Sequence, residues 1–469
     1  VVNTILNKKE FGRTYDDRYA NLQSAGWKIY TTLNLNLQKT AQHVMNTYIP
    51  KHSDVFNIGS SAVSVEVGTG RIITMVENKD FNNSSSHPGR DATAVNYNTD
   101  HAYGGSSGFQ PGSTFKLFTL LQWLKTGHTL YDRVDGHPRT ILPSTLTQCG
   151  APYRGVPWSV GNDSPSENGF FSVAQATALS VNGAFASMAQ QVDLCDIRNL
   201  AQKAGVHPAT GGSLDDFAPF VIGGASAVAP LSMATAYAGI ANDGKACSPI
   251  AIDRIVKTDG SEMQPPKSTC KQVVSKPVAV AANFALRQVF TGGTAAADRT
   301  ADGIYEVGKT GTTDNAEQTW MIGSTSKVTT AVWVGNVSGT QNLRKTSLGY
   351  CPVGYSAQAA VQRHCLWKGI QTAVNKVYGG ATNWAQPDSK YLTGVSSTPT
   401  TTTATGTVPD VAGMTKVQAQ SALVAAGYAW AIGAPVASSK PAGTVVSTTP
   451  AAGASAPGHT EVTIHPSSG

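Results

Sequence analysis

Apolar side chains recur at helical spacing directly after a Pro-Gly turn in the first third of the chain. The leucines at this spacing are Leu117, Leu120, Leu121 and Leu124. Pro111-Gly112 cannot lie inside a helix, and Gly127 is a typical residue just beyond a helix end. The pattern therefore predicts a buried helix whose first turn contains Ser113. Lys116, three residues further, would lie on the same face one turn along.

The remaining periodicity predicts an α+β fold. Period-2 alternation predicts a hairpin over residues 60–76, and helical spacing predicts helices at 33–48, 172–204 with a break near 180–183, 230–242 and 272–290. Strand-like runs follow at 305–312, 319–323 and 328–334. Because a hairpin precedes the helices and more strands follow them, we expect an antiparallel sheet with helices packed on it.

Composition shifts divide the chain into four parts. Residues 1–30 show little periodicity and are typical of a connecting region, so 1–50 are assigned to a linker region with a leading helix. Residues 51–385 form the main domain, and 393–407 have the Thr, Ser and Pro content of a linker. Residues 408–466 then give a small α/β unit, with a helix from 415 to 426 and short strands near 445 and 463. We expect this unit to be independent, on a flexible tether, with Trp430 packed against its own helix.

Charge and composition exclude several classes of protein. The 469 residues carry a net charge of +6 without a long basic run, so nucleic acid is not an expected partner, whereas an anionic wall or membrane surface remains compatible. No apolar run is long enough to span a bilayer, and the chain starts without Met or a signal peptide, so we expect a soluble fragment of a longer protein. The six cysteines lack zinc-site spacing, and we expect neither a metal nor a cofactor.

Ser113 and Lys116 form a candidate nucleophile and base. A serine hydroxyl needs a group that takes its proton, and a partly desolvated lysine can do so because desolvation lowers its pKa. The helix N-terminus would add positive potential where an oxyanion forms. Ser at a helix start followed by Lys is also ordinary capping chemistry. The same Ser-x-x-Lys spacing recurs at Ser268/Lys271 and Ser324/Lys327, without the Pro-Gly turn or the long apolar helix.

Two further motifs follow Ser-x-x-Lys in order. Ser180-Val181-Asn182 interrupts a helical run, and Lys309-Thr310-Gly311-Thr312 opens the strand region. The Ser-x-Asn motif has a second match at Ser166-Glu167-Asn168, in an irregular stretch, and the Lys-Thr-Gly motif has one at Lys125-Thr126-Gly127, at the end of a helix. The set Ser-x-x-Lys, Ser-x-Asn, Lys-Thr-Gly resembles the penicillin-recognising serine acyltransferases.

The resemblance extends over nearly all of residues 30–466. Gly223-Gly224 with the segment 228–237, and the segment 309–323, resemble bifunctional (class A) penicillin-binding proteins. Val408-Pro409-Asp410 with Gly413, Ala419, Leu423 and Gly427 resembles one PASTA module. The glycosyltransferase domain of that family has no counterpart here. The implied fold is the serine β-lactamase/transpeptidase fold, an antiparallel sheet flanked by helices with a helical subdomain, followed by a small α/β PASTA domain.

The resemblance implies a D,D-transpeptidase that cross-links peptidoglycan stem peptides and is trapped by β-lactams. Ser113 would attack the penultimate D-Ala carbonyl and Lys116 would be the base. Ser180 would relay the proton, and Asn182 would bind the substrate amide while touching Lys116. The terminal carboxylate would be bound by Lys309, Thr310 and Thr312, with Gly311 between them. The backbone N–H groups of Ser113 and Thr312 would form the oxyanion hole.

Alternative functions remain open. The chain could be a D,D-carboxypeptidase or a β-lactamase-type hydrolase, although no Glu-x-x-Leu-Asn loop between the second and third motifs offers a deacylating carboxylate. It could also be a non-catalytic sensor of penicillin or muropeptides.

The family further implies the extracytoplasmic face of the bacterial membrane, with an anchor outside this chain. In that oxidising location six cysteines permit 15 pairings. Because loop closure favours short spacings, we expect Cys351–Cys365, Cys247–Cys270 and Cys149–Cys195.

Overall fold

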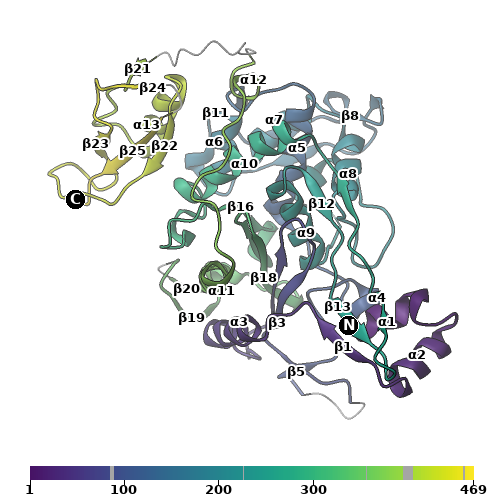
Figure 1. Ribbon diagram of the computed structural model, residues 1–469. Coiled ribbons are helices and arrows are strands. Elements are labelled where there is room, and N and C mark those ends of the chain that lie inside the picture. The colour runs from purple at the N-terminus through teal and green to yellow at the C-terminus, as the bar shows by residue number, and fades with distance from the viewer. Residues whose placement is uncertain (85–88, 225, 355, 395–404, 458–459) are drawn as a thin grey trace.

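A five-stranded antiparallel sheet lies at the centre of the larger part of the molecule (Figure 1). The computed structural model describes residues 1–84, 89–224, 226–354, 356–394, 405–457 and 460–469. The strands of the sheet, in spatial order, are β16 (Val307–Thr312), β17 (Gln318–Ser324), β18 (Val328–Ser338), β2 (Asn57–Glu66) and β3 (Ile72–Glu77). The predicted hairpin and the later strands therefore join in one sheet through the β18–β2 pair, in which Trp333 lies opposite Ser61.

Helices cover both faces of this sheet, because its strands are apolar on both sides. Along β17, Trp320 and Ile322 belong to one apolar cluster and Met321 to the other. The first face is covered by α9 (Pro230–Ala241) and α10 (Lys276–Thr291), and the second by α3 (Leu35–Tyr48) and α11 (Gln362–Tyr378). The predicted α+β class is confirmed.

A helical subdomain surrounds α5 (Lys116–Lys125), whose residues are buried apart from Lys125 at its end. Its other helices are α6 (Val173–Leu179), α7 (Asn182–Ala189) and α8 (Leu194–Lys203). The predicted break in the helical run is confirmed, because α6 ends and α7 begins on either side of Ser180-Val181.

The first 31 residues form regular structure, which their weak periodicity did not predict. They contain α1 (Val2–Asn7), α2 (Tyr15–Ser24) and β1 (Lys28–Thr31), and β1 joins a sheet with β13 (Ile252–Val256) and β14 (Glu262–Met263). Ile5 and Phe11 are buried against Ile252 and Ile255. Elements this short show no clear period in the sequence, and their apolar partners lie far along the chain.

The C-terminal domain is a small α/β unit. Its elements are β21 (Thr405–Thr407), α13 (Lys416–Ala425), β22 (Ala429–Ile432), β23 (Val445–Thr449), β24 (Ser455–Pro457) and β25 (Glu461–Pro466). The last three residues of the predicted linker are thus a strand paired with β24, while 395–404 lie outside the described residues. Trp430 is buried with Ala419 and Leu423, as expected.

The C-terminal domain packs on the larger part of the molecule, which contradicts the expectation of an independent unit. The indole ring of Trp430 lies directly over Gly292, at the end of α10. An ion pair of 3.0 Å joins Arg287 to Glu461, and Ala178 belongs to the apolar cluster of the C-terminal domain. The composition of the linker predicts a flexible connection, but it carries no information about the surface on which the following domain packs.

The three disulfides have the expected pairing. They join Cys149 to Cys195, Cys247 to Cys270 and Cys351 to Cys365. Cys247–Cys270 links the paired strands β12 (Lys245–Cys247) and β15 (Cys270–Gln272), and Cys351–Cys365 ties β19 (Ser347–Cys351) to α11. The pairing is therefore confirmed, and it fits an oxidising compartment.

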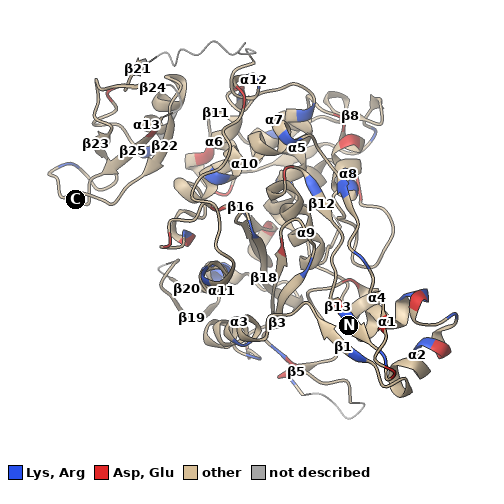
Figure 2. Ribbon diagram, in the orientation of Figure 1, with Lys and Arg blue, Asp and Glu red and all other residues tan. Residues whose placement is uncertain are grey.

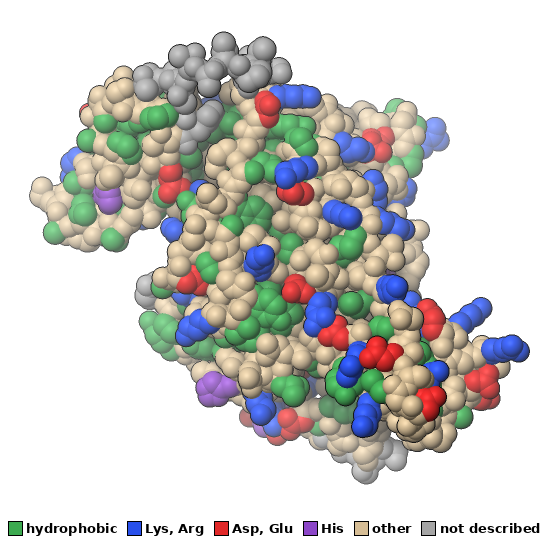
Figure 3. Space-filling view, in the orientation of Figure 1, with side chains coloured by type: hydrophobic (Ala, Val, Ile, Leu, Met, Phe, Trp, Pro, Cys, Tyr) green, Lys and Arg blue, Asp and Glu red, His purple; other side chains and the backbone are tan. Residues whose placement is uncertain are grey.

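Short elements complete the chain. They are α4 (His101–Gly104), α12 (Ser389–Leu392) and the strands β4 (Asp80–Phe81), β5 (Ala92–Thr93), β6 (Arg133–Asp135), β7 (Arg139–Ile141), β8 (Thr147–Gln148), β9 (Ala151–Pro152), β10 (Trp158–Val160), β11 (Phe170–Ser172) and β20 (Ser356–Gln358). Both signs of charge are carried by α2 in Figure 2, and basic and acidic side chains are interspersed on the face seen in Figure 3. Among the described residues, no helix is both long and apolar enough to cross a bilayer.

Candidate active site

The three sequence motifs meet at one cleft beside the edge strand β16. The cleft has a volume of about 360 Å³, and residues of all three motifs line it, namely Ser113, Ser180, Asn182, Thr310 and Thr312. Lys116 and Lys309 lie buried behind this lining. The structure thus brings together residues that are almost 200 positions apart in the sequence.

Ser113 lies in a tight 3₁₀ turn, Gly112–Phe115, that leads into α5 at Lys116. The predicted helix is present, but its first turn is 3₁₀ rather than α. Two glycines let this turn approach β16: a Cβ on Gly112, whose φ is +50°, would lie 2.8 Å from the Thr312 carbonyl oxygen. A Cβ on Gly311 would lie 2.5 Å from the carbonyl oxygen of Pro111. Side chains at these two positions would push the Ser113 turn away from the third motif.

Lys116 is 1% exposed and points at the second motif. Its Nζ donates to the carbonyl oxygen of Ser180 at 2.6 Å, to Asn182 Oδ1 at 2.6 Å and to Ser180 Oγ at 3.3 Å. Burial lowers the pKa of Lys116 to about 7, against an opposing influence of the Glu167 and Asp163 carboxylates. A large fraction of this amine is therefore neutral near neutral pH, as a general base must be.

The position of Ser180 depends on an unusual backbone conformation. Ser180 ends α6 in the left-handed region, with φ of 64°, and Asn182 then begins α7. Asn182 Nδ2 donates to the carbonyl oxygen of Gly161 at 2.9 Å, which leaves its Oδ1 for Lys116. A non-glycine residue in this region is strained, and such strain is concentrated at functional sites.

Lys309 lies on β16 and is 1% exposed. Burial, with the nearby charges of Lys116 and Arg363, holds its pKa well below the ordinary lysine value. Its Nζ donates to the carbonyl oxygen of Thr310 at 3.2 Å, while Thr310 Oγ1 shares a hydrogen bond of 2.6 Å with Thr294 Oγ1.

Arg363, on α11, is a site residue that the sequence reasoning missed. Its Nη1 donates to Thr312 Oγ1 at 3.0 Å and to the carbonyl oxygen of Gly311 at 3.2 Å. Burial lowers the pKa of Arg363 to about 10, which still leaves the guanidinium charged at neutral pH. It adds a cation beside Thr312, where the third motif would hold a carboxylate. No short motif marks this residue, since it lies on a helix of ordinary pattern.

Three charged residues of the cleft lining were also missed as site residues. Arg344 donates to the two carboxylate oxygens of Asp163 at 2.6 and 2.5 Å, and both residues line the cleft together with Glu167. Glu167 belongs to the second Ser-x-Asn match, whose Ser166 and Asn168 do not line the cleft. Its side chain enters the site from an irregular loop, where no periodicity could predict its direction.

The other candidate motifs lie elsewhere. Ser324 is buried at the end of β17 and shares a hydrogen bond of 2.6 Å with Thr329 Oγ1, and Ser268 Oγ donates to the carbonyl oxygen of Ser248 at 2.7 Å. Lys125 is exposed at the far end of α5. These motif matches therefore do not contribute to the cleft.

Curated relatives match the larger part of the chain. Penicillin-binding protein 1A of Aquifex aeolicus is 28% identical over 281 residues, which are 60% of this chain and 34% of that protein. Penicillin-binding protein 2a of Streptococcus pneumoniae is 27% identical over 351 residues, 73% of this chain and 43% of that protein. The chain thus spans less than half the length of these relatives.

Solved structures show the same fold. PonA1 of Mycobacterium tuberculosis, a penicillin-binding protein, aligns with a TM-score of 0.63 at 21% identity over 81% of this chain and 92% of that one. PonA1 in complex with penicillin V gives a TM-score of 0.62 at 21% identity, over 82% and 94%.

Family models account for both parts of the molecule. The penicillin binding protein transpeptidase domain matches residues 60–350, which contain all three motifs, and the PASTA domain matches residues 406–467. The resemblance to class A penicillin-binding proteins is confirmed by the relatives of type 1A. The chain therefore belongs to the penicillin-binding protein transpeptidase family and carries a C-terminal PASTA domain.

Proposed function

We propose that this chain is a serine-type D,D-transpeptidase that cross-links peptidoglycan stem peptides and is acylated by β-lactams. The observation that carries the proposal is Lys116, an almost fully buried amine with a pKa near 7, bonded to Ser180 and Asn182 in the cleft that Ser113 lines. Neutral Lys116 would take the Ser113 proton as Ser113 attacks the penultimate D-Ala carbonyl. Ser180, which touches Lys116, would pass that proton to the leaving D-Ala.

The charges of the cleft support the same substrate. Lys309, Thr310 and Thr312 would bind the terminal carboxylate, and Arg363 would add its charge there. The backbone N–H groups of Ser113 and Thr312 would stabilise the oxyanion, which the close approach of Gly112 to Thr312 permits. The three disulfides support a location on the extracytoplasmic face of the membrane.

Mass spectrometry after incubation with penicillin V tests the proposal. We expect one covalent adduct per chain, located on Ser113 by peptide mapping and absent from Ser113→Ala. Turnover of a peptide ending in D-Ala-D-Ala then separates an enzyme from a penicillin sensor. An adduct on another serine would refute the assignment of Ser113, and an adduct without turnover would favour the sensor.

A further inference from the structure

Three acidic residues line the cleft among the described residues, namely Asp163, Glu167 and Asp314. Of these, Glu167 is the one that is partly buried and forms no ion pair with another described residue. Asp163 is held by the two hydrogen bonds of Arg344, whereas Glu167 makes no ion pair within the described residues. Among the described residues, its Oε2 accepts the backbone N–H of Asp163 at 3.2 Å and its Oε1 has no hydrogen-bond partner. Burial raises the pKa of this carboxyl group above its ordinary value.

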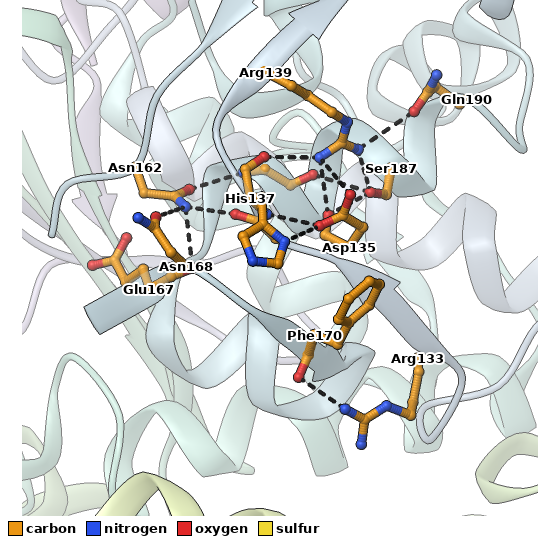
Figure 4. A network of polar contacts seen from close by, with 12 residues as sticks. Arg133, Asp135, His137, Arg139, Asn162, Glu167, Asn168, Phe170, Ser187 and Gln190 are labelled. Atoms are coloured by element: carbon orange, nitrogen blue, oxygen red, sulfur yellow. Dashed lines mark hydrogen bonds and ion pairs between the residues drawn. The ribbon is translucent and has the colours of Figure 1, made fainter. Parts of the chain in front are cut away.

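Hydrogen bonds of Asn162 hold the loop around Glu167, so the carboxylate is placed there by the fold. Asn162 Nδ2 donates to the carbonyl oxygens of Gly136 and Glu167 at 2.6 and 3.1 Å, and Asn162 Oδ1 accepts from the backbone N–H of Gly183 at 2.9 Å. Figure 4 shows this network, with the Glu167 carboxylate directed away from it. Because Gly183 follows Asn182 in α7, Glu167 is fixed relative to the second motif.

The cations of the cleft lie close to Glu167 without pairing with it, among the described residues. Lys309 on β16 and Arg363 on α11 lie where a carboxylate would bind. Glu167 lies near enough to feel the charges of Lys116, Lys309 and Arg344. Because none of these cations forms an ion pair with it among the described residues, a cationic ligand would make the direct contact that this half-buried carboxylate lacks. A cationic ligand in a cleft that also contains the nucleophile fits the second substrate of an acyl transfer, an amine.

We propose that Glu167 binds the ammonium group of the acceptor amine in the second half of the reaction and takes its first proton. This inference rests on the proposed function. The carboxylate accepts one proton from the ammonium, so that a neutral amine faces the ester of Ser113. The nitrogen lone pair then forms the C–N bond, the bond from the carbonyl carbon to Ser113 Oγ breaks, and the second proton of the amine passes to that oxygen through Lys116. Glu167 finally releases its proton to solvent, so one ammonium and one ester give one amide, one serine hydroxyl and one proton.

The test measures how the acyl-enzyme divides between amine and water. Wild-type protein and Glu167→Gln are acylated with a D-alanyl thioester donor at about pH 8. Mass spectrometry first verifies that each protein carries the adduct on Ser113. D-alanine is then added as an acceptor with an ammonium group, or hydroxylamine as an amine that is uncharged at this pH. Glu10→Gln, exposed and remote from the cleft, is the matched control.

We expect the ratio of aminolysis to hydrolysis with D-alanine to fall about tenfold in Glu167→Gln, the effect of one lost charge-assisted contact. The ratio with hydroxylamine should change less than about twofold, because no ammonium has to be bound. An unchanged D-alanine ratio in an acylated variant overturns the inference. A joint loss of hydrolysis and of both aminolysis reactions also overturns it, since Glu167 would then be a general base for deacylation. If the wild type forms no adduct, the proposed function fails instead.

Discussion

The pH dependence of Ser113 acylation follows from the burial of Lys116. An ammonium loses its hydration in the protein interior, so burial favours the neutral amine and lowers the pKa from 10.5 to about 7. The reactive neutral form is therefore present above pH 7 and is lost as the pH falls through the folded-state pKa. The perturbations that test this are a change of pH from 6 to 8 and the substitution Lys116→Arg.

The magnitude follows from the two pKa values. With a pKa of about 7, roughly one-tenth of Lys116 is neutral at pH 6 and roughly nine-tenths at pH 8, so the acylation rate constant should rise about tenfold. With the ordinary value of 10.5, only about 0.3% would be neutral at pH 8. Burial thus increases the reactive form about 300-fold at this pH. Arginine cannot lose its proton, so Lys116→Arg should lower the rate constant at least about 100-fold without any rise from pH 6 to 8.

The assay is the second-order rate constant for adduct formation with penicillin V, followed by intact-protein mass spectrometry at several pH values. This constant reports the ionisation of the free enzyme. Lys125→Arg, exposed at the end of the same helix, is the matched control and should follow the wild type. Circular dichroism melts check that each variant is folded. A flat profile between pH 6 and 8, or a folded Lys116→Arg that acylates at the wild-type rate, would refute the reasoning.

Three further predictions concern stability, redox state and domain contact. Burial raises the pKa of Glu77 to about 8, so between pH 4.5 and 8 the unfolded chain releases a proton that the native protein keeps. The free energy of unfolding should therefore fall as the pH rises through this range. Glu77→Gln should raise Tm at pH 8 more than at pH 5. Thiol titration under denaturing, non-reducing conditions should find no free cysteine, and any thiol detected would contradict the three disulfides. In Gly292→Val the new side chain would collide with the Trp430 ring, so small-angle scattering should show a larger radius of gyration, while Ser113 acylation stays within a few-fold. An unchanged radius would mean that this contact does not hold the PASTA domain in place.

Local patterns predicted the elements that carry the motifs. The leucines of α5, the break at Ser180 and the strand at Lys309 are encoded within a few residues each, so spacing alone located them. The agreement in the order of the three motifs then implied that they meet, as they do in the cleft.

The residues that were missed depend on packing between distant elements. Arg363 reaches Thr312 only because α11 lies across the sheet, and nothing in its own helix indicates this. Glu167 depends on Asn162, which holds an irregular loop against α7. The contact of Trp430 with Gly292 joins two domains, and the pattern of each domain can be interpreted without reference to the other. Composition and periodicity report the neighbourhood of a residue along the chain, and these three contacts lie outside that range.

The pairing of β18 with β2 determines when the protein can fold. Ser64 and Thr330 share a hydrogen bond across 266 positions of sequence, and the β16 strand with Lys309 joins the sheet only through β17 and β18. Contacts of such separation have to wait for the intervening chain to collapse, which makes folding slow. While a chain is being synthesised from its N-terminus, the β2–β3 hairpin therefore exists first with an unpaired edge, which is prone to association with other chains. The nucleophile turn is made early and the residues that complete its site late, so a nascent chain has no working cleft until Arg363 has emerged.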